Sequence, residues 1–237
     1  MPDATVHFEL TRFRERYAEL RSEVDALAPG VPPRIVLVTK YLDADACATL
    51  AAAGFQPFGE NRTTDLAAKA DFAGPAARWQ FIGHLQRNKI AKTLPLIELF
   101  HALDSERLAA GIQTWATSNS GRSLACLVEV NLSGETTKGG VSASAALTWL
   151  PDWVKRFPQI EFRGLMTMAP ELAPNEEPER CRPIFAGLRS LRDRIAAKLP
   201  AEAQARFVEL SMGMSSDYRV ATQEGATLLR LGRILYS

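Results

Sequence analysis

An unbroken run of β-branched and aliphatic residues, Ile35 to Val38, most constrains how this chain can fold. Such a run is typical of a strand that is buried on both faces, as in a parallel sheet covered by helices. Pro32 and Pro33 precede the run and prevent a helix from continuing into it. The strand ends on Lys40, and a helical pattern follows at once. Since ligands bind at the carboxyl ends of parallel strands, the sequence places a lysine where a ligand is expected.

Two interpretations of Lys40 follow from this position. A lysine with an apolar stem and a partly desolvated amine can act as a nucleophile. Alternatively, the side chain extends from the strand end into water, as long basic side chains often do. The first strand alone does not decide between these interpretations.

Seven further predicted strands alternate with helices along the chain. They are expected around residue 58 and at residues 79–82, 99–102, 124–130, 160–165, 206–209 and 228–231. Eight strands that alternate with helices favour a (β/α)8 TIM barrel in the α/β class. The alternative, a doubly wound open sheet, usually carries a glycine-rich loop after its first strand, where this chain has Lys40-Tyr41-Leu42.

An extra helix is predicted before the first strand, at about residues 6–28, because apolar residues recur there at steps of three and four. We expect it to pack on the outside of the barrel. Asp104 is expected to cap the helix after the fourth strand. With no internal repeat and no linker, residues 1–237 are expected to form a single domain.

Charge and cysteine content exclude several functional classes. The formal net charge is +1 and no basic stripe is present, which argues against a nucleic-acid partner or a membrane surface. The three cysteines are far apart, so free thiols in a reducing compartment are expected, without a disulfide or a metal site. No apolar run could span a bilayer, and the N-terminus lacks the pattern of a signal peptide. We expect a soluble cytoplasmic protein.

Two turns at the ends of the last strands have the composition of an anion site. Ser211, Gly213 and Ser215 lie in a small hydroxylated turn that is expected to open a helix, where backbone N–H groups can bind a phosphate. Gly232 and Arg233 follow the eighth strand, and barrels commonly bind phosphate after strands seven and eight. A capping turn has the same composition, so the turn alone is a weak signal.

A phosphate site and a nucleophilic lysine at one barrel mouth fit a phosphorylated aldehyde held as a Schiff base. Pyridoxal 5'-phosphate is such a molecule. Arg230 is then a candidate partner for the pyridine nitrogen. Because a guanidinium keeps its proton, it would leave the ring nitrogen unprotonated and the ring a weaker electron sink.

The chain resembles the pyridoxal phosphate homeostasis proteins, which are similar in fold to the barrel domain of alanine racemase. The resemblance extends from about residue 33 to residue 236. Its matching segments, in chain order, are LVTK, FGENR, WQFIGHLQRNK, VNLSGETTKGGV, RGLMTMAP, LSMGMSSDY and LRLGRILY.

The resemblance implies a cofactor role for residues at the predicted strand ends. Lys40 would carry the Schiff base, and Arg230 would lie opposite the ring nitrogen. The residues implied around the phosphate are Ser211, Gly213, Ser215 and Gly232. Less specific positions in the family's cofactor pocket are Asn61, His84 and Asn131. The chain departs from the family at Arg233, where a small or hydroxylated residue is common, and at Thr39, where serine is usual.

The function implied by the resemblance is to carry or buffer pyridoxal phosphate without substrate turnover. The alternative is an amino-acid racemase or lyase that uses the same lysine. Racemisation needs a second acid/base group, which the racemases take from a further domain of a partner subunit, and this chain is expected to lack that domain. A Schiff-base aldolase would need a carboxylate beside the lysine, and Glu60 is the one candidate. A monomer is expected, with apo forms of pyridoxal phosphate-dependent enzymes as recipients.

Overall fold

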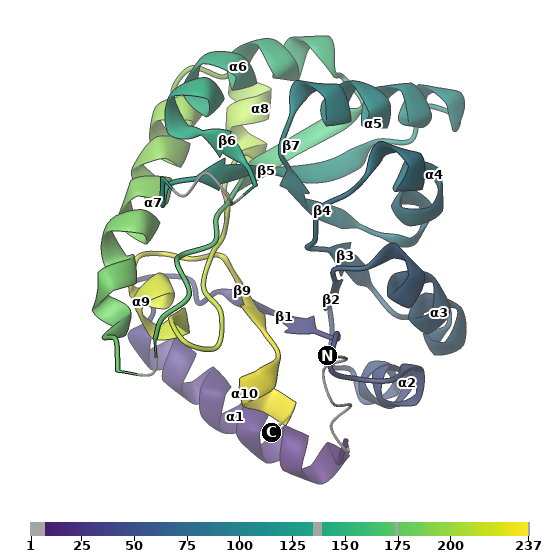
Figure 1. Cartoon of the computed structure of the whole chain (residues 1–237), viewed down its shortest axis with the longest axis vertical. Helices are drawn as coiled ribbons and strands as arrows, with labels where there is room; N and C mark the ends of the chain where they lie inside the picture. The colour runs from purple at the N-terminus through teal and green to yellow at the C-terminus, as the bar shows by residue number, and fades with distance from the viewer. Residues whose placement is uncertain (1–7, 135–138, 174, 237) are drawn as a thin grey trace.

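In a computed structural model, which describes residues 8–134, 139–173 and 175–236, the chain forms a closed (β/α)8 barrel (Figure 1). All the strand pairings are parallel, and β1 pairs with both β2 and β9, which closes the ring. The barrel strands are β1 (Arg34–Val38), β2 (Phe58–Glu60), β3 (Trp79–Phe81), β4 (Leu99–Leu103), β5 (Leu124–Asn131), β7 (Ile160–Met166), β8 (Glu209–Ser211) and β9 (Leu228–Leu231). The two-residue β6 (Val141–Ser142) adds to the end of β5.

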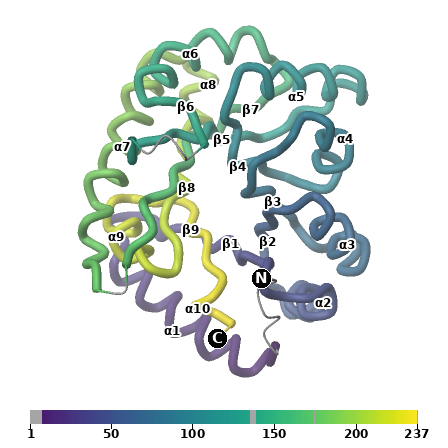
Figure 2. Tube along the Cα trace, viewed as in Figure 1, coloured from purple at the N-terminus to yellow at the C-terminus, as the bar shows by residue number. Residues whose placement is uncertain are grey.

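Helices surround the ring of strands on the outside (Figure 2). They are α1 (Leu10–Leu27), α2 (Ala44–Ala52), α3 (Thr63–Ala73), α4 (Ile90–Thr93), α5 (Glu106–Ser118), α6 (Ala143–Arg156), α7 (Arg182–Ala196), α8 (Ala201–Arg206), α9 (Tyr218–Gln223) and α10 (Arg233–Tyr236). Short 3-10 helices lie at Arg87–Lys89, Leu94–Leu96 and Pro178–Cys181. The predicted fold class is therefore confirmed.

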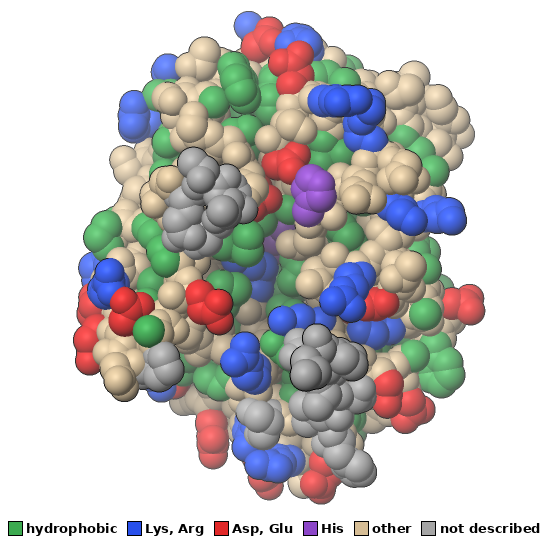
Figure 3. Space-filling view, in the orientation of Figure 1, with side chains coloured by type: hydrophobic (Ala, Val, Ile, Leu, Met, Phe, Trp, Pro, Cys, Tyr) green, Lys and Arg blue, Asp and Glu red, His purple; other side chains and the backbone are tan. Residues whose placement is uncertain are grey.

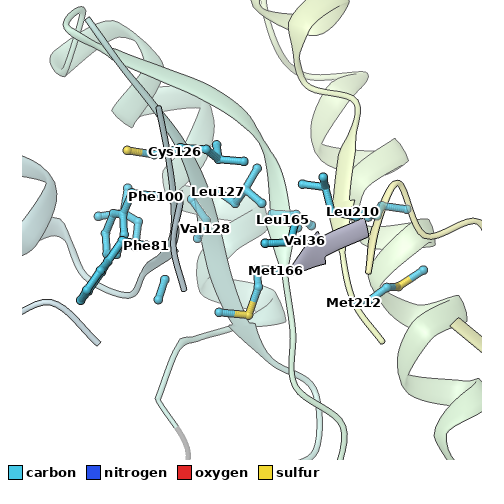
Figure 4. Packing of buried hydrophobic residues seen from close by; sticks show 14 of the residues in the cluster. Val36, Phe81, Phe100, Cys126, Leu127, Val128, Leu165, Met166, Leu210 and Met212 are labelled. Carbon is cyan, nitrogen blue, oxygen red and sulfur yellow. The ribbon is translucent and has the colours of Figure 1, made fainter. Parts of the chain in front are cut away.

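The barrel strands carry mainly buried apolar side chains, as the sequence runs predicted. Figure 4 shows Val36, Leu165 and Leu210 from three strands among these buried side chains. The rings of Phe81 and Phe100 lie beside each other, with centroids 6.2 Å apart. Burial of each such side chain contributes about 1.5–3 kcal/mol to folding, which makes this apolar core the main source of stability.

The helix before the first strand packs on the outside of the barrel, as predicted. It begins at Leu10 rather than near residue 6, and residues 6 and 7 lie outside the described part of the chain. Its buried face includes Phe13, whose ring centroid lies 5.0 Å from that of Phe55 and 5.9 Å from that of Tyr236. These contacts attach α1 to the segment after α2 and to α10.

Two local predictions are wrong. The seventh barrel strand is Glu209–Ser211 rather than residues 206–209, because Arg206 ends the short helix α8. The cap of α5 is Ser105, whose hydroxyl accepts a hydrogen bond from the Leu108 N–H. Asp104 instead binds the ring of His84. The three cysteines are free and buried, as expected.

One glycine is required by the approach of two barrel strands. Gly164, in β7, has a φ of +151°, and a Cβ there would lie 2.0 Å from the carbonyl oxygen of Glu209 in β8. We predict that Gly164→Ala lowers the free energy of unfolding by about 1–3 kcal/mol or more, because the two strands must separate. Urea denaturation measures this change.

Gly30 provides the matched control, because a Cβ there would meet no atom within 4 Å. Gly30→Ala should leave stability unchanged or raise it by up to about 1 kcal/mol. Equal denaturation midpoints for the two variants would contradict the strand contact described at Gly164.

Candidate functional site

Three neighbouring strands bring the predicted lysine, arginine and glycine-serine turn to one part of the barrel rim. β9 pairs with β1 on one side and with β8 on the other. Lys40 follows the end of β1, Gly232 follows β9, and Ser211 is the last residue of β8. Basic and histidine side chains gather near the centre of the face seen in Figure 3. Residues that are far apart in sequence therefore meet at the carboxyl ends of adjacent strands.

Lys40 is exposed at this rim. One interpretation of the sequence expected a partly desolvated amine, and the side chain does not have that environment. Its Nζ lies 4.6 Å from the centroid of the Tyr41 ring, a cation–π arrangement. The preceding Thr39 is fully buried. Lys40 is thus an accessible amine on a backbone that is fixed one residue earlier.

A buried ion pair fixes that backbone. Lys69, on α3, donates from Nζ to the Thr39 carbonyl at 2.8 Å and to Glu60 Oε2 at 2.7 Å. The Thr39 hydroxyl donates to the same carboxylate oxygen at 2.9 Å. The other oxygen, Oε1, accepts from the Asn61 N–H at 2.8 Å. Both oxygens of Glu60 are therefore engaged, so this carboxylate is not placed as an acid/base group beside Lys40.

Arg230 is buried in the barrel interior, where neutral groups accept its hydrogen bonds and nearby carboxylates stabilise its charge. Its Nη1 donates to Ser211 Oγ at 2.7 Å and its Nη2 donates to the Thr167 carbonyl at 3.0 Å. Burial lowers the pKa of Arg230 to about 10, and the nearby carboxylates of Asp217 and Glu129 oppose that shift. The guanidinium therefore remains protonated at neutral pH.

Ser211 and His101 continue the polar contacts away from Arg230. The Ser211 hydroxyl lies 2.9 Å from Nδ1 of His101, which is fully buried in β4. The other ring nitrogen, Nε2, lies 2.8 Å from Gln80 Oε1. His101 is therefore a buried core histidine with both ring nitrogens hydrogen-bonded. The Ser211 hydroxyl is bonded within the interior, and the place of Ser211 around a phosphate stays a prediction.

The turn after β8 is shaped by a buried carboxylate. Asp217 Oδ1 accepts a hydrogen bond from the Met214 N–H at 2.6 Å. Burial raises the pKa of Asp217, and this backbone hydrogen bond opposes the shift. Within the described residues, the N–H groups of Ser215 and Ser216 donate no hydrogen bond. They can therefore serve an anion, although the helix that follows, α9, has only six residues and contributes little dipole.

Gly213 and Gly232 allow close packing at these two turns. A Cβ at Gly213, where φ is +93°, would lie 2.6 Å from the Ala221 Cβ. A Cβ at Gly232 would lie 3.3 Å from the Tyr41 ring and 3.2 Å from the Val38 carbonyl oxygen. Arg233, which departs from the family pattern, is exposed at the start of α10.

The remaining predicted residues lie elsewhere on the rim. Asn61 follows β2 and is exposed. His84, which follows β3, is also exposed, and its Nδ1 lies 2.9 Å from Asp104 Oδ2. Asn131 ends β5, and its Oδ1 accepts from the Gly134 N–H at 3.2 Å. These three are at strand ends, as predicted. Asn61 follows β2, which pairs with β1, whereas β3 and β5 pair with neither β1 nor β9.

Sequence reasoning missed the buried polar groups that support the residues of the site. Lys69 lies in an alanine-rich helix, where nothing local marks it as buried. Gln80, Glu129 and Asp217 are buried polar residues, and a polar residue inside an apolar strand run was the available signal for the first two. The set of groups at β1, β8 and β9 is an amine, a buried guanidinium and a turn of N–H donors. These groups fit a phosphorylated aldehyde that carries a ring nitrogen.

Among the described residues, no group of three or more His, Cys, Asp or Glu side chains could hold a metal ion. In the same part of the chain, no helix has both the length and the apolar character needed to cross a membrane.

Comparison with known proteins finds relatives of the chain, although no protein-family model matches it. A pyridoxal phosphate homeostasis protein of Aquifex aeolicus is 40% identical over 184 residues, which cover 77% of each protein. The structure of PipY from Synechococcus elongatus PCC7942, described with pyridoxal phosphate bound, aligns with a TM-score of 0.81 at 32% identity. That alignment covers 95% of this chain and all of PipY.

A more distant structural neighbour shows the fold alone. D-threonine aldolase from Filomicrobium marinum aligns with a TM-score of 0.74 at 15% identity, and the alignment covers 62% of that enzyme. The barrel is thus shared with a longer enzyme whose chemistry does not transfer at this identity.

The Lys69–Glu60 pair generates a stability prediction. Lys69→Met should cost about 3–5 kcal/mol of unfolding free energy, because it leaves the Glu60 carboxylate buried without its cation. Thermal or urea denaturation of the apo protein measures the loss. The double variant Lys69→Met/Glu60→Gln should recover part of it, since the uncompensated charge is then removed.

Arg206→Met is the matched control, because Arg206 and Glu202 form an ion pair with both side chains exposed. Its loss should be below about 1 kcal/mol. If the two single variants lose stability equally, the buried pair beneath Lys40 does not stabilise the fold as described.

Proposed function

The chain belongs to the family of pyridoxal phosphate homeostasis proteins, and we propose that it binds pyridoxal 5'-phosphate at the rim formed by β1, β8 and β9 and carries or buffers it. The observation that carries this proposal is the meeting of Lys40, Arg230 and the Ser215 turn on three adjacent strands. The names of the curated relatives and the cofactor bound by PipY support it.

In this proposal each part of the rim has a separate task. Lys40 provides the amine for covalent attachment of the aldehyde. The N–H groups of Ser215 and Ser216, with the Gly232 turn, hold the phosphate. Arg230 faces the ring nitrogen with a group that donates hydrogen bonds and keeps its proton. When bound, the cofactor supplies an electrophilic carbon and an electron-withdrawing ring. Because the guanidinium leaves the ring nitrogen unprotonated, the ring is a weak electron sink.

We also propose that the protein does not turn over amino acids. The proposal rests on where the possible second acid/base groups lie. Racemisation needs such a group on the far face of the substrate carbon. The Tyr218 hydroxyl donates to Glu23 at 2.8 Å, and Tyr236 is buried. Tyr41 lies beside Lys40 rather than opposite it. None of these tyrosines is placed as a racemase's second base.

The cellular role follows from the same proposal. We place the protein in the cytoplasm as a monomer, with the barrel as the whole cofactor-binding unit. Its partners are pyridoxal phosphate and apo forms of enzymes that need it. An exposed Lys40 suits such exchange, because an incoming amine can reach the attachment site.

The attachment site can be tested directly. Lys40→Ala should abolish the visible absorbance band of the bound cofactor while the far-ultraviolet circular dichroism stays unchanged. Borohydride reduction of the parent protein should add the cofactor's mass to the peptide that contains Lys40. Lys92→Ala, at an exposed lysine of α4, is the control and should keep the band. An undiminished band in Lys40→Ala would move the attachment to another lysine.

Turnover provides a separate test. We expect the pure holo protein to racemise alanine and other common amino acids no faster than free pyridoxal phosphate, measured by chiral chromatography over hours. The reason is that only one face of a bound amino acid would meet an acid/base group. Sustained turnover that is lost in Lys40→Ala would instead favour the racemase or lyase reading.

A further inference from the structure

A line of four hydrogen bonds runs from the exposed Glu98 through the buried side chains of the barrel interior and ends at Arg230. It begins at Glu98, where Oε1 accepts from Gln80 Nε2 at 3.0 Å. Gln80 Oε1 lies 2.8 Å from His101 Nε2, and His101 Nδ1 lies 2.9 Å from Ser211 Oγ. Ser211 Oγ lies 2.7 Å from Arg230 Nη1. The line therefore connects β3, β4, β8 and β9 through side chains alone.

The two ends of this line determine the direction of every bond in it when the His101 ring is neutral. A guanidinium can only donate, so Ser211 Oγ accepts from Arg230, while a carboxylate can only accept, so the Gln80 amide points its NH2 at Glu98. Gln80 Oε1 is then left to accept from His101, which places the ring proton on Nε2. His101 Nδ1 therefore accepts, and the single proton of the Ser211 hydroxyl donates to it.

Protonation of both ring nitrogens would be the other arrangement compatible with these distances. It is disfavoured because His101 is fully buried and close to a second cation. Burial, with the charges of Arg230 and Arg34, lowers the pKa of His101 well below its usual value. The neutral ring with its proton on Nε2 remains.

We propose that Gln80, His101 and Ser211 form a relay of positioning residues that holds the Arg230 guanidinium toward the cofactor ring. This inference rests on the proposed function and adds to it a role for three residues that would not themselves touch the cofactor. Ser211 acts here through Arg230, in place of the phosphate contact expected from sequence.

The relay matters because Arg230 makes only one other side-chain hydrogen bond within the part of the chain that the structure describes. Its other hydrogen bond goes to the Thr167 carbonyl, which fixes one point of the guanidinium plane. The bond to Ser211 fixes a second point and so sets the direction of the remaining N–H groups. Hydrogen bonds in such a line polarise one another, so that loss of one member weakens the next.

The first experiment reads the relay in the apo protein. Long-range proton–nitrogen NMR spectra of 15N-labelled protein, with the His101 signals assigned by a His101→Gln variant, should show the ring proton on Nε2 at neutral pH. In Gln80→Leu the preference for Nε2 should fall, because Nε2 loses its acceptor. A proton on Nδ1 in the parent, or spectra that are identical in Gln80→Leu, would overturn the relay.

The second experiment reads its effect on the cofactor. Ser211→Ala should weaken binding of pyridoxal phosphate about tenfold, the effect of one hydrogen bond to a charged group, and should shift the visible band. Ser211→Thr keeps the hydroxyl and should restore both. Thr222→Val removes a buried hydroxyl in α9, which donates to the Tyr218 carbonyl at 2.7 Å, and should change neither.

The outcomes separate the two proposals. A parent protein that binds no pyridoxal phosphate would overturn the proposed function. A parent that binds it, with a Ser211→Ala variant of equal affinity and unchanged band, would overturn the relay alone. If Ser211→Ala does not fold, the NMR comparison of the parent with Gln80→Leu still decides whether the relay exists.

Discussion

The buried charge of Arg230 is the constraint on which the interior of this barrel depends. An unpaired cation in an apolar interior costs many kcal/mol, so its surroundings must supply acceptors and negative charge. Ser211 and the Thr167 carbonyl accept its hydrogen bonds, and the carboxylates of Asp217 and Glu129 oppose the effect of burial on its pKa. These groups come from different strands and turns, so the burial of one arginine requires polar residues at several positions around the barrel.

The barrel itself was predictable because its strands are short runs whose apolar character does not depend on distant partners. The runs at β1 and β5 are buried, as their composition indicates. The strand at Glu209–Ser211 was misplaced by three residues at its start, because the preceding residues form a short helix. A run of three strand residues has no periodicity strong enough to compete with that helix.

The site was predictable only in part, for a related reason. Lys40 and Arg230 stand at strand ends, and strand ends can be located from sequence. The hydroxyl of Ser211 has two possible directions from the same backbone position, and its partner His101 lies over a hundred residues away. Lys69 donates to the Thr39 carbonyl from a helix whose sequence does not distinguish it from a helix with a solvent-exposed lysine. Contacts between segments distant in sequence decide where the side chains of Ser211 and Lys69 bind. The cofactor roles of Lys40, Arg230 and Ser211 stay predictions.

On the proposed function, the burial of Arg230 and the exposure of Lys40 would let one site both recognise and release its ligand. Arg230 is buried and held at two points, so the ring contact proposed for it would require little reorganisation. Lys40 is exposed on a backbone held by Lys69, so a covalent bond formed there remains open to attack by another amine. An enzyme would need to enclose that bond and place a second base beside it. A carrier needs the opposite arrangement, in which the recognition groups are buried and the reactive bond is accessible.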